Sequence, residues 1–200
     1  MKRFVKYSLL TLFFALSTAV AAQSPVVLLK GISNRMIDQL ERNKARLSHS
    51  GVVNGIVQRT LLPYVDLNRM SALVVGPNYW RSATAGQKSQ FKREFTNMVI
   101  STYAAAISSY NGDRVLFYPL RGGYSGGTVQ VRSVIVRRNG RRIPVSYSMF
   151  SIQGSWRVYD FSVENVSIVN SYRAQFSNVL SRSGMTGLIA RLQRHNRKVR

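Results

Sequence analysis

The sequence predicts an α+β domain, in which an antiparallel meander sheet of four strands, or slightly more, is packed on one face by several helices. Apolar residues recur at helical spacing in 24–110 and again in 167–197, whereas 113–163 is rich in β-forming residues and turns. Short turns separate the β-rich runs, which favours a meander. Helices first, a sheet next and helices last are typical of α+β domains.

Residues 1–22 have the parts of a cleavable signal peptide. A positively charged start precedes an apolar stretch, Leu9–Leu16, and small residues at Ala19–Ala22 offer a cleavage site. A membrane anchor is the less favoured alternative, because a spanning helix needs about 20 apolar residues and this run is interrupted by Ser and Thr. We therefore expect export of one domain, residues 23–200.

The boundaries of the first helices are marked by prolines, glycines and capping residues. Pro25 opens the first helix, and Pro63 ends the second. Asp66 is expected to cap a short third helix, which ends at Gly76. Trp80 is then expected to lie in a connecting turn.

A fourth, long helix is predicted before the sheet. Thr84 and Gln87 have the spacing of a capping box, and about seven helical turns follow. One face of this helix is formed by Phe91, Phe95, Met98, Thr102, Ala106 and Tyr110. This aromatic content suits packing in a core.

The predicted strands are Val115–Leu120, Thr128–Arg137, Ile143–Ile152 and Trp156–Val163. Asn139-Gly140 is the strongest two-residue hairpin signal available, and a Gly-rich loop, 121–127, joins the first two strands. At least the third strand has a distinct buried face, because alternate residues of a strand share a face. That face carries Ile143, Val145, Tyr147 and Met149.

Helical spacing returns after Ser167, and Gly184 is expected to end this helix. A last amphipathic segment follows. The apolar positions of the two segments are Val169, Tyr172, Phe176 and Val179, then Met185, Leu188, Ile189 and Leu192.

Composition limits the function classes. The chain has 29 Lys and Arg, 7 Asp and Glu, a formal net charge of +22 and no cysteine. The lack of cysteine excludes disulfides, zinc-thiolate sites and thiol chemistry. In an exported protein the positive charge favours anionic lipid surfaces or acidic proteins over nucleic acid. The densest basic run, residues 191–200, is explained equally well as a solvated tail.

Signals for catalysis are weak. Gly123–Gly127 matches the G-x-S-x-G motif, but a strand follows it where a hydrolase needs a helix. His49 lies in a polar loop and His195 in the basic C-terminal run. Asp160 and Glu164 could form an acid–base pair, but we favour ion pairing with nearby arginines. We therefore expect no enzyme activity, no metal and no cofactor, and an exported esterase is our third hypothesis.

Several segments together resemble the MlaC family, also called the toluene-tolerance family, of periplasmic phospholipid-transport proteins. The first is Leu62–Leu67, continued by Met70, Gly76, Trp80 and Arg81. The second comprises Gln87, Phe91, Phe95 and Tyr103. The third and most specific comprises Trp156–Asp160, Ser167, Asn170–Arg173, Gln175 and Phe176, and the pattern ends with Gly184, Leu188, Ile189 and Leu192.

The resemblance implies a fold of the nuclear-transport-factor-like or cystatin-like class, with an apolar pocket for phospholipid acyl chains between sheet and helices. It implies a monomeric periplasmic carrier that helps to maintain outer-membrane lipid asymmetry. Its partners would be the MlaA–porin complex at the outer membrane and the MlaD subunit of the inner-membrane ABC transporter. The alternative from another class is a basic periplasmic protein that docks on anionic envelope surfaces without cargo.

Within this interpretation, pocket residues are expected from the long helix and from the sheet, whose inward face the sequence leaves open. They are Met98, Tyr103, Ile107, Val131, Val145, Tyr147, Met149, Val158 and Phe161. Asp160 and Arg173 are expected to form a structural ion pair.

Overall fold

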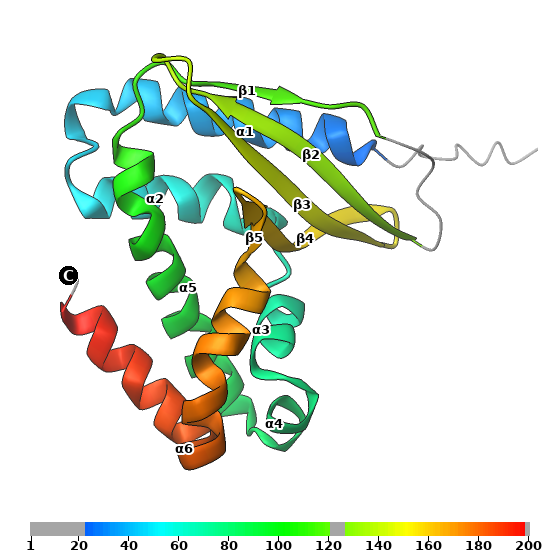
Figure 1. Ribbon diagram of the computed structural model, residues 1–200, viewed down its shortest axis with the longest axis vertical. Helices are drawn as coiled ribbons and strands as arrows, with labels where there is room; N and C mark the ends of the chain where they lie inside the picture. Colours follow the sequence, from blue (N-terminus) through cyan, green and yellow to red (C-terminus); the bar gives the residue numbers. More distant parts are fainter. Residues whose placement is uncertain (1–22, 121–126, 199–200) are drawn as a thin grey trace, which may run out of the picture.

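The computed structural model describes residues 23–120 and 127–198 (Figure 1). The predicted signal peptide and the Gly-x-Ser-x-Gly motif lie outside these residues, except for Gly127. The helical elements are α1 (Pro25–Arg42), η1 (Lys44–Arg46), α2 (Ser50–Thr60), η2 (Leu62–Tyr64), α3 (Leu67–Val75), α4 (Pro77–Ser82), α5 (Ala85–Ser108) and α6 (Ile168–Lys198). The strands are β1 (Arg114–Phe117), β2 (Thr128–Val136), β3 (Arg142–Ile152), β4 (Ser155–Val163) and β5 (Val166–Ser167).

The predicted α+β class and antiparallel meander are confirmed. The five strands lie in the order β1-β2-β3-β4-β5, and all neighbours are antiparallel. A hairpin turn lies where it is predicted, but it is longer than the predicted two residues: the Arg137 N–H donates to the Arg141 carbonyl at 2.9 Å, so the loop is Arg138, Asn139 and Gly140, and Gly140 has a φ of 82°. The additional strand, β5, is two residues long and leads directly into α6.

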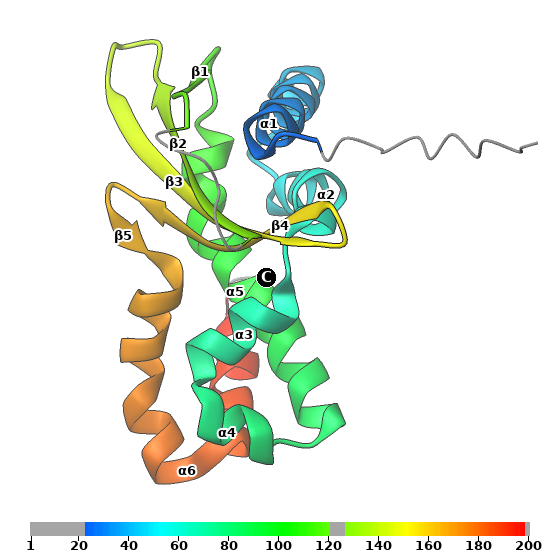
Figure 2. The ribbon, with the colours of Figure 1, turned by 90° about the vertical axis from the view of Figure 1, so that its right-hand side faces the viewer.

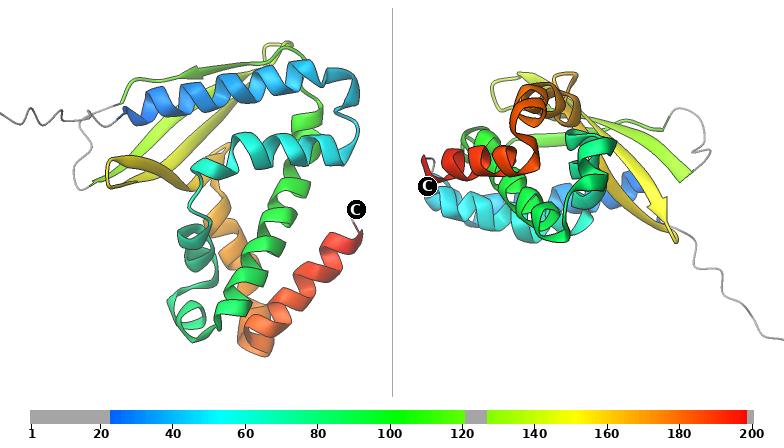
Figure 3. Two further views of the ribbon diagram at one scale, coloured as in Figure 1. Left: turned by 180° about the vertical axis from the view of Figure 1, so that it is seen from behind. Right: turned by 90° about the horizontal axis from the view of Figure 1, so that it is seen from below.

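Near the end of β3, Arg69 of α3 stacks on Phe150, with its Cζ 4.2 Å from the ring centroid. Over β1 and β2, the packed helices lie on one face of the sheet. Figure 2 shows α1 and α2 beside that face, and Figure 3 shows α1 lying along the strands with α2 next to it. Leu29 and Ile32 of α1 form a sheet cluster with buried residues of β2, β3 and β4. Those residues are Val131, Met149, Trp156 and Val158. The first half of α5, α3, α4 and α6 extend beyond the sheet (Figure 1).

Two further groups of buried side chains complete the core. The helical cluster joins α3, α5 and α6 through aromatic rings: Phe95 stacks on Phe91 with centroids 5.4 Å apart and meets Tyr172 edge-on at 5.2 Å. The α2 cluster consists of Leu40, Leu47, Val53, Ile56, Val57 and Ile100. Because α5 contributes to both clusters, it is the element that connects the two parts of the domain.

Cap signals in the sequence locate the helices well, with one exception. Thr84 and Gln87 make both hydrogen bonds of the predicted capping box, and Gly184, with φ 57° and ψ −162°, breaks α6 where a stop is predicted. The prediction of a turn around Trp80 is wrong. Pro77 opens the short helix α4, because proline's fixed φ suits a first helical position. Within the described residues, no helix combines the length and apolar character needed to cross a bilayer.

Candidate functional site

An apolar cavity of about 120 Å³ lies where the three core clusters meet. It is enclosed by α2, η2, α3, α5 and one strand, β4. Its wall consists of Val57, Leu61, Leu62, Val65, Leu67, Met70, Phe95, Thr96, Val99, Ile100, Tyr103, Ile107 and Phe161. None of these thirteen residues is charged, so the wall offers dispersion contacts to an apolar ligand and little else.

Helix α5 contributes one long side of the cavity. Its lining residues extend from Phe95 to Ile107 at helical spacing, so they share one face of the helix. Twelve residue steps at 1.5 Å each correspond to about 18 Å along the helix axis. The α5 wall is therefore long enough to follow an extended hydrocarbon chain.

Two lining side chains carry a polar atom. The hydroxyl of Thr96 is buried without a hydrogen-bond partner, whereas Thr102, on the same helix, donates its hydroxyl to the Met98 carbonyl at 2.8 Å. Burial raises the pKa of Tyr103, and the neighbouring Tyr172 raises it further. Both groups are therefore neutral at physiological pH, which keeps the cavity free of charge.

The size of the cavity limits what it can hold as it stands. A cavity of about 150 Å³ lined by aliphatic and aromatic side chains accommodates benzene, and this one is smaller at about 120 Å³. Two acyl chains would need the surrounding helices and sheet to separate. Such widening would separate the three core clusters from one another and would leave the packing inside each cluster intact, because the cavity lies between them.

Comparison with known proteins places this arrangement in a family. Residues 30–194 match the family model described as MlaC protein. The chain belongs to the MlaC family. The expected resemblance is thereby confirmed.

Two relatives of this chain are similar to it over most of its length. It is 26% identical over 188 residues to the intermembrane phospholipid transport system binding protein MlaC of Haemophilus influenzae, covering 92% of this chain and 87% of that protein. It is 28% identical over 166 residues to the toluene tolerance protein ttg2D of Pseudomonas putida, covering 82% and 77%.

One solved structure shares the fold. It is the phospholipid-binding protein from Ralstonia solanacearum, described in complex with a phospholipid. The TM-score is 0.83 with 24% sequence identity, and the match covers 88% of this chain and 99% of that one.

Three of the residues predicted for the pocket line this cavity: Tyr103, Ile107 and Phe161. The other six lie elsewhere. Met98 belongs to the helical cluster; Val131, Tyr147, Met149 and Val158 belong to the sheet cluster beneath α1; Val145 is buried opposite Ser133. Leu29 and Ile32 of α1 pack on the sheet cluster, whereas Phe161 of β4 lies against Tyr103 of α5, with ring centroids 6.4 Å apart.

The predicted ion pair between Asp160 and Arg173 is not formed. Asp160 accepts hydrogen bonds from the Ser167 hydroxyl at 2.6 Å and the Val169 N–H at 3.0 Å, near the start of α6. Arg173 instead donates from Nε to the Leu73 carbonyl at 2.6 Å. Asp160 therefore holds the start of α6 and Arg173 holds α6 to α3, so both are structural, but with different partners.

Ten of the thirteen lining residues are outside the predicted set: four lie on α5, and the others lie in α2, in α3 and in the segment that links these two helices. In and beside that segment, Leu62, Val65 and Leu67 belong to the family motif, but only the neighbouring Pro63 and Asp66 have a predicted role, as helix boundaries. The motif itself was the available signal. The Asp66 N–H donates to the Val158 carbonyl at 2.8 Å, and this contact with the sheet turns the neighbouring apolar residues toward the cavity.

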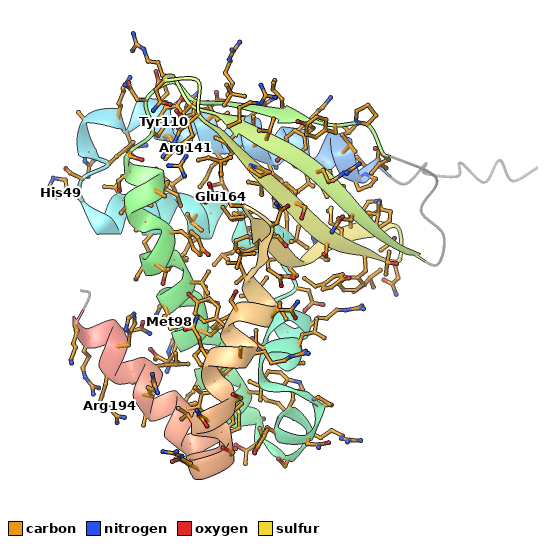
Figure 4. All side chains as sticks on the ribbon, in the orientation of Figure 1. His49, Met98, Tyr110, Arg141, Glu164 and Arg194 are labelled. Carbon is orange, nitrogen blue, oxygen red and sulfur yellow. The ribbon has the colours of Figure 1, made fainter. Side chains whose placement is uncertain are left out.

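The residues considered for acid–base or metal chemistry do not come together. His49 and Arg194 lie far apart on the outside of the domain, whereas Arg141 and Glu164 lie together near the β2–β3 turn (Figure 4) and form an ion pair of 3.0 Å. Across residues 23–120 and 127–198, no three His, Asp or Glu side chains are arranged to hold a metal ion.

Proposed function

We propose that this chain is a periplasmic phospholipid carrier that binds acyl chains in the cavity along α5. The observation that supports this most directly is an uncharged, elongated cavity in a fold that a phospholipid-bound protein shares. The names of the relatives agree, since one is a phospholipid transport system binding protein. We propose Tyr103, Ile107 and Phe161 as acyl-chain contacts.

The energetics of acyl chains explain why such a carrier would need partners. Burying about 30 methylenes at roughly 0.8 kcal/mol each would contribute about 24 kcal/mol before any cost of binding. That exceeds the practical limit of about 18–21 kcal/mol for non-covalent affinity. Release into water would be negligible, whereas transfer into another apolar channel or a bilayer would be nearly balanced.

We propose the MlaA–porin complex and the MlaD subunit as the donor and acceptor of the lipid, in either direction. The signal-peptide features of residues 1–22 support delivery to the compartment between them. Mass spectrometry of the exported protein tests the proposed export, because cleavage after Ala22 predicts a mature chain that begins at Gln23.

The deciding experiment is to purify residues 23–200 under native conditions, extract them with organic solvent and identify phospholipid by mass spectrometry. A carrier yields phospholipid in a fixed proportion to protein. If the folded protein holds no lipid and takes none up from vesicles, the carrier function is wrong and the cargo-free interaction protein is favoured.

A further inference from the structure

Among the described residues, one face of β1, β2 and the first half of β3 has no helix packed on it; near the end of β3, Arg69 of α3 stacks on Phe150 on that face. Phe117 and Val131 point toward α1 and pack in the sheet cluster, so their alternating neighbours point the opposite way. Figure 2 shows α1 and α2 on one side of β1 and β2 and no helix on the other. We call the uncovered side the outer sheet face.

Apolar side chains are exposed on the outer sheet face. Leu116, Val134 and Pro144 are register partners across three strands. Leu116 is 47% exposed and Pro144 is also exposed, with Val134 buried between them. Tyr118, 46% exposed, continues the β1 pattern and donates its N–H to the Arg132 carbonyl.

Three arginines surround these apolar side chains. Arg114 and Arg142 flank Val136 in one register row, and Arg132 lies in the row of Ser146. All three are exposed, and within the described part of the chain none of them pairs with a carboxylate.

The nearby carboxylates already have partners. Asp113 pairs with Arg137 at 2.6 Å, Glu164 with Arg141 at 3.0 Å, and Asp160 accepts from Ser167 and Val169. The outer sheet face is therefore an apolar row between unpaired positive charges.

We propose that the outer sheet face docks on the surface of an anionic lipid bilayer. Guanidinium groups form paired hydrogen bonds with phosphate oxygens. Leucine and tyrosine side chains are suited to the boundary between headgroups and acyl chains. Residues 23–200 have a formal net charge of +19, which is the +22 of the full sequence less Lys2, Arg3 and Lys6, and this charge attracts the molecule to an extended anionic plane.

A bilayer fits this face better than an acidic protein does. Protein interfaces usually fix their register with charges of both signs around a well-packed apolar centre. Within the described residues, the outer sheet face has unpaired charges of one sign around the exposed Leu116, Pro144 and Tyr118, and this arrangement specifies no register. Lipid headgroups rearrange around such a surface, so binding to a bilayer requires no fixed register.

Docking through this face is separate from the proposed cargo site and goes beyond the proposed function. Phe161, the strand residue of the cavity, is the register partner of Tyr147, which lies on the inner face with Val131. Vesicle binding should therefore be the same for protein with and without lipid in the cavity.

The test measures co-sedimentation of residues 23–200 with vesicles of phosphatidylcholine alone or mixed with phosphatidylglycerol. We expect binding only to the mixed vesicles, decreasing with salt. The triple variant R114Q/R132Q/R142Q should bind at least about tenfold more weakly, since each arginine near an anionic surface contributes independently. A matched triple variant, R182Q/R191Q/R194Q, removes the same charge from exposed positions of α6. Its binding to the mixed vesicles should decrease much less.

A second variant tests the apolar part of the face. L116S/Y118S should weaken binding to the mixed vesicles while leaving its salt dependence unchanged. Circular dichroism confirms that each variant is folded, and the lipid extracted from it shows whether the cargo site is intact.

The proposal is overturned if the two triple variants weaken vesicle binding equally, or if the α6 triple variant weakens it more. It is also overturned if the protein binds phosphatidylcholine vesicles as tightly as the mixed vesicles. A third contradictory result is that the protein does not bind vesicles but binds poly-glutamate through Arg114, Arg132 and Arg142, since the face would then recognise acidic protein. None of these outcomes affects the cargo test.

Discussion

The side-chain amide of Asn196 donates two hydrogen bonds to Glu94, one to its backbone carbonyl at 2.9 Å and one to its carboxylate at 2.8 Å. Both residues are buried, at 6% and 8% exposure. This contact joins the end of α6 to the middle of α5, 102 residues apart in the chain. It fixes the C-terminal half of α6 along the helix that lines the cavity.

Replacing Asn196 with Leu should lower the free energy of unfolding by about 1–3 kcal/mol, because the Glu94 carboxylate loses its buried donor. Urea unfolding followed by circular dichroism measures the change. R197Q, an exposed neighbour, should change stability by less than about 0.5 kcal/mol. Adding E94L to N196L should recover part of the loss; if it deepens the loss, the pairing is not its cause.

Replacing Gly184 with Ala should cost about 1–3 kcal/mol, because its φ of 57° and ψ of −162° suit glycine almost alone. No atom lies within 4 Å of an added Cβ, so the cost would be conformational strain and not a clash. G51A is the control: Gly51 lies in α2, also has open space, and should tolerate Ala or gain up to about 1 kcal/mol. Thermal unfolding compares the two, and equal effects would contradict the assignment.

Filling the cavity should displace its ligand. V99F adds a ring to a lining position of α5, and overpacking of about 1–3 kcal/mol corresponds to a roughly 5- to 150-fold loss of affinity. The phospholipid extracted per protein, measured by mass spectrometry, should fall accordingly. A105F places the same ring on an exposed α5 position outside the wall and should keep its lipid. Unchanged lipid in folded V99F would show that the ligand lies elsewhere.

Stability should decrease at high pH, in part because of Tyr147. Burial raises the pKa of Tyr147 above its ordinary value of 10.0, although a hydrogen bond from Ser133 lowers it slightly. As pH rises, the unfolded chain therefore releases the Tyr147 hydroxyl proton before the folded chain does. The contribution of Tyr147 to the free energy of unfolding is complete below the ordinary pKa. It is lost as pH rises through the raised pKa.

Y147F removes this group while keeping the ring that stacks on Phe117. Urea unfolding midpoints measured from about pH 8 to pH 11 should fall less steeply for Y147F than for the wild-type protein. The slope should not vanish, because burial also raises the pKa values of Tyr103 and Tyr110. An identical slope in both proteins would contradict the prediction.

Local signals explain which parts of the fold were predicted. The Thr84–Gln87 capping box, the Asn139-Gly140 turn and the Gly184 break each depend on a few adjacent residues. Their conformations follow from hydrogen bonding and steric limits within that short segment. The prediction of a turn around Trp80 is wrong because Gly76-Pro77 both ends one helix and opens the next. The sequence shows only that the first helix is interrupted.

The cavity could be predicted only in part. A buried apolar residue and a cavity-lining residue have the same character, so Met98 and Tyr103, on one predicted apolar helix, could not be separated. Asp160 and Arg173 illustrate the same limit for polar residues: opposite charges suggest a pair, but each has closer partners in Ser167 and Leu73.

Although helix α4 is not predicted, the sequence alone is sufficient for the α+β class, the antiparallel meander, the basic charge and the family. These follow from periodicity, composition and motifs, which depend on residues near one another in the chain or on simple counts. The tertiary structure alone decided that α1 covers Val131 and Met149, that Phe161 reaches α5, and that the other face of β1 and β2 stays uncovered. Such contacts join residues far apart in the chain, 161 − 103 = 58 positions for Phe161 and Tyr103 and 149 − 29 = 120 for Met149 and Leu29, and packing geometry selects them among partners of equal chemical character.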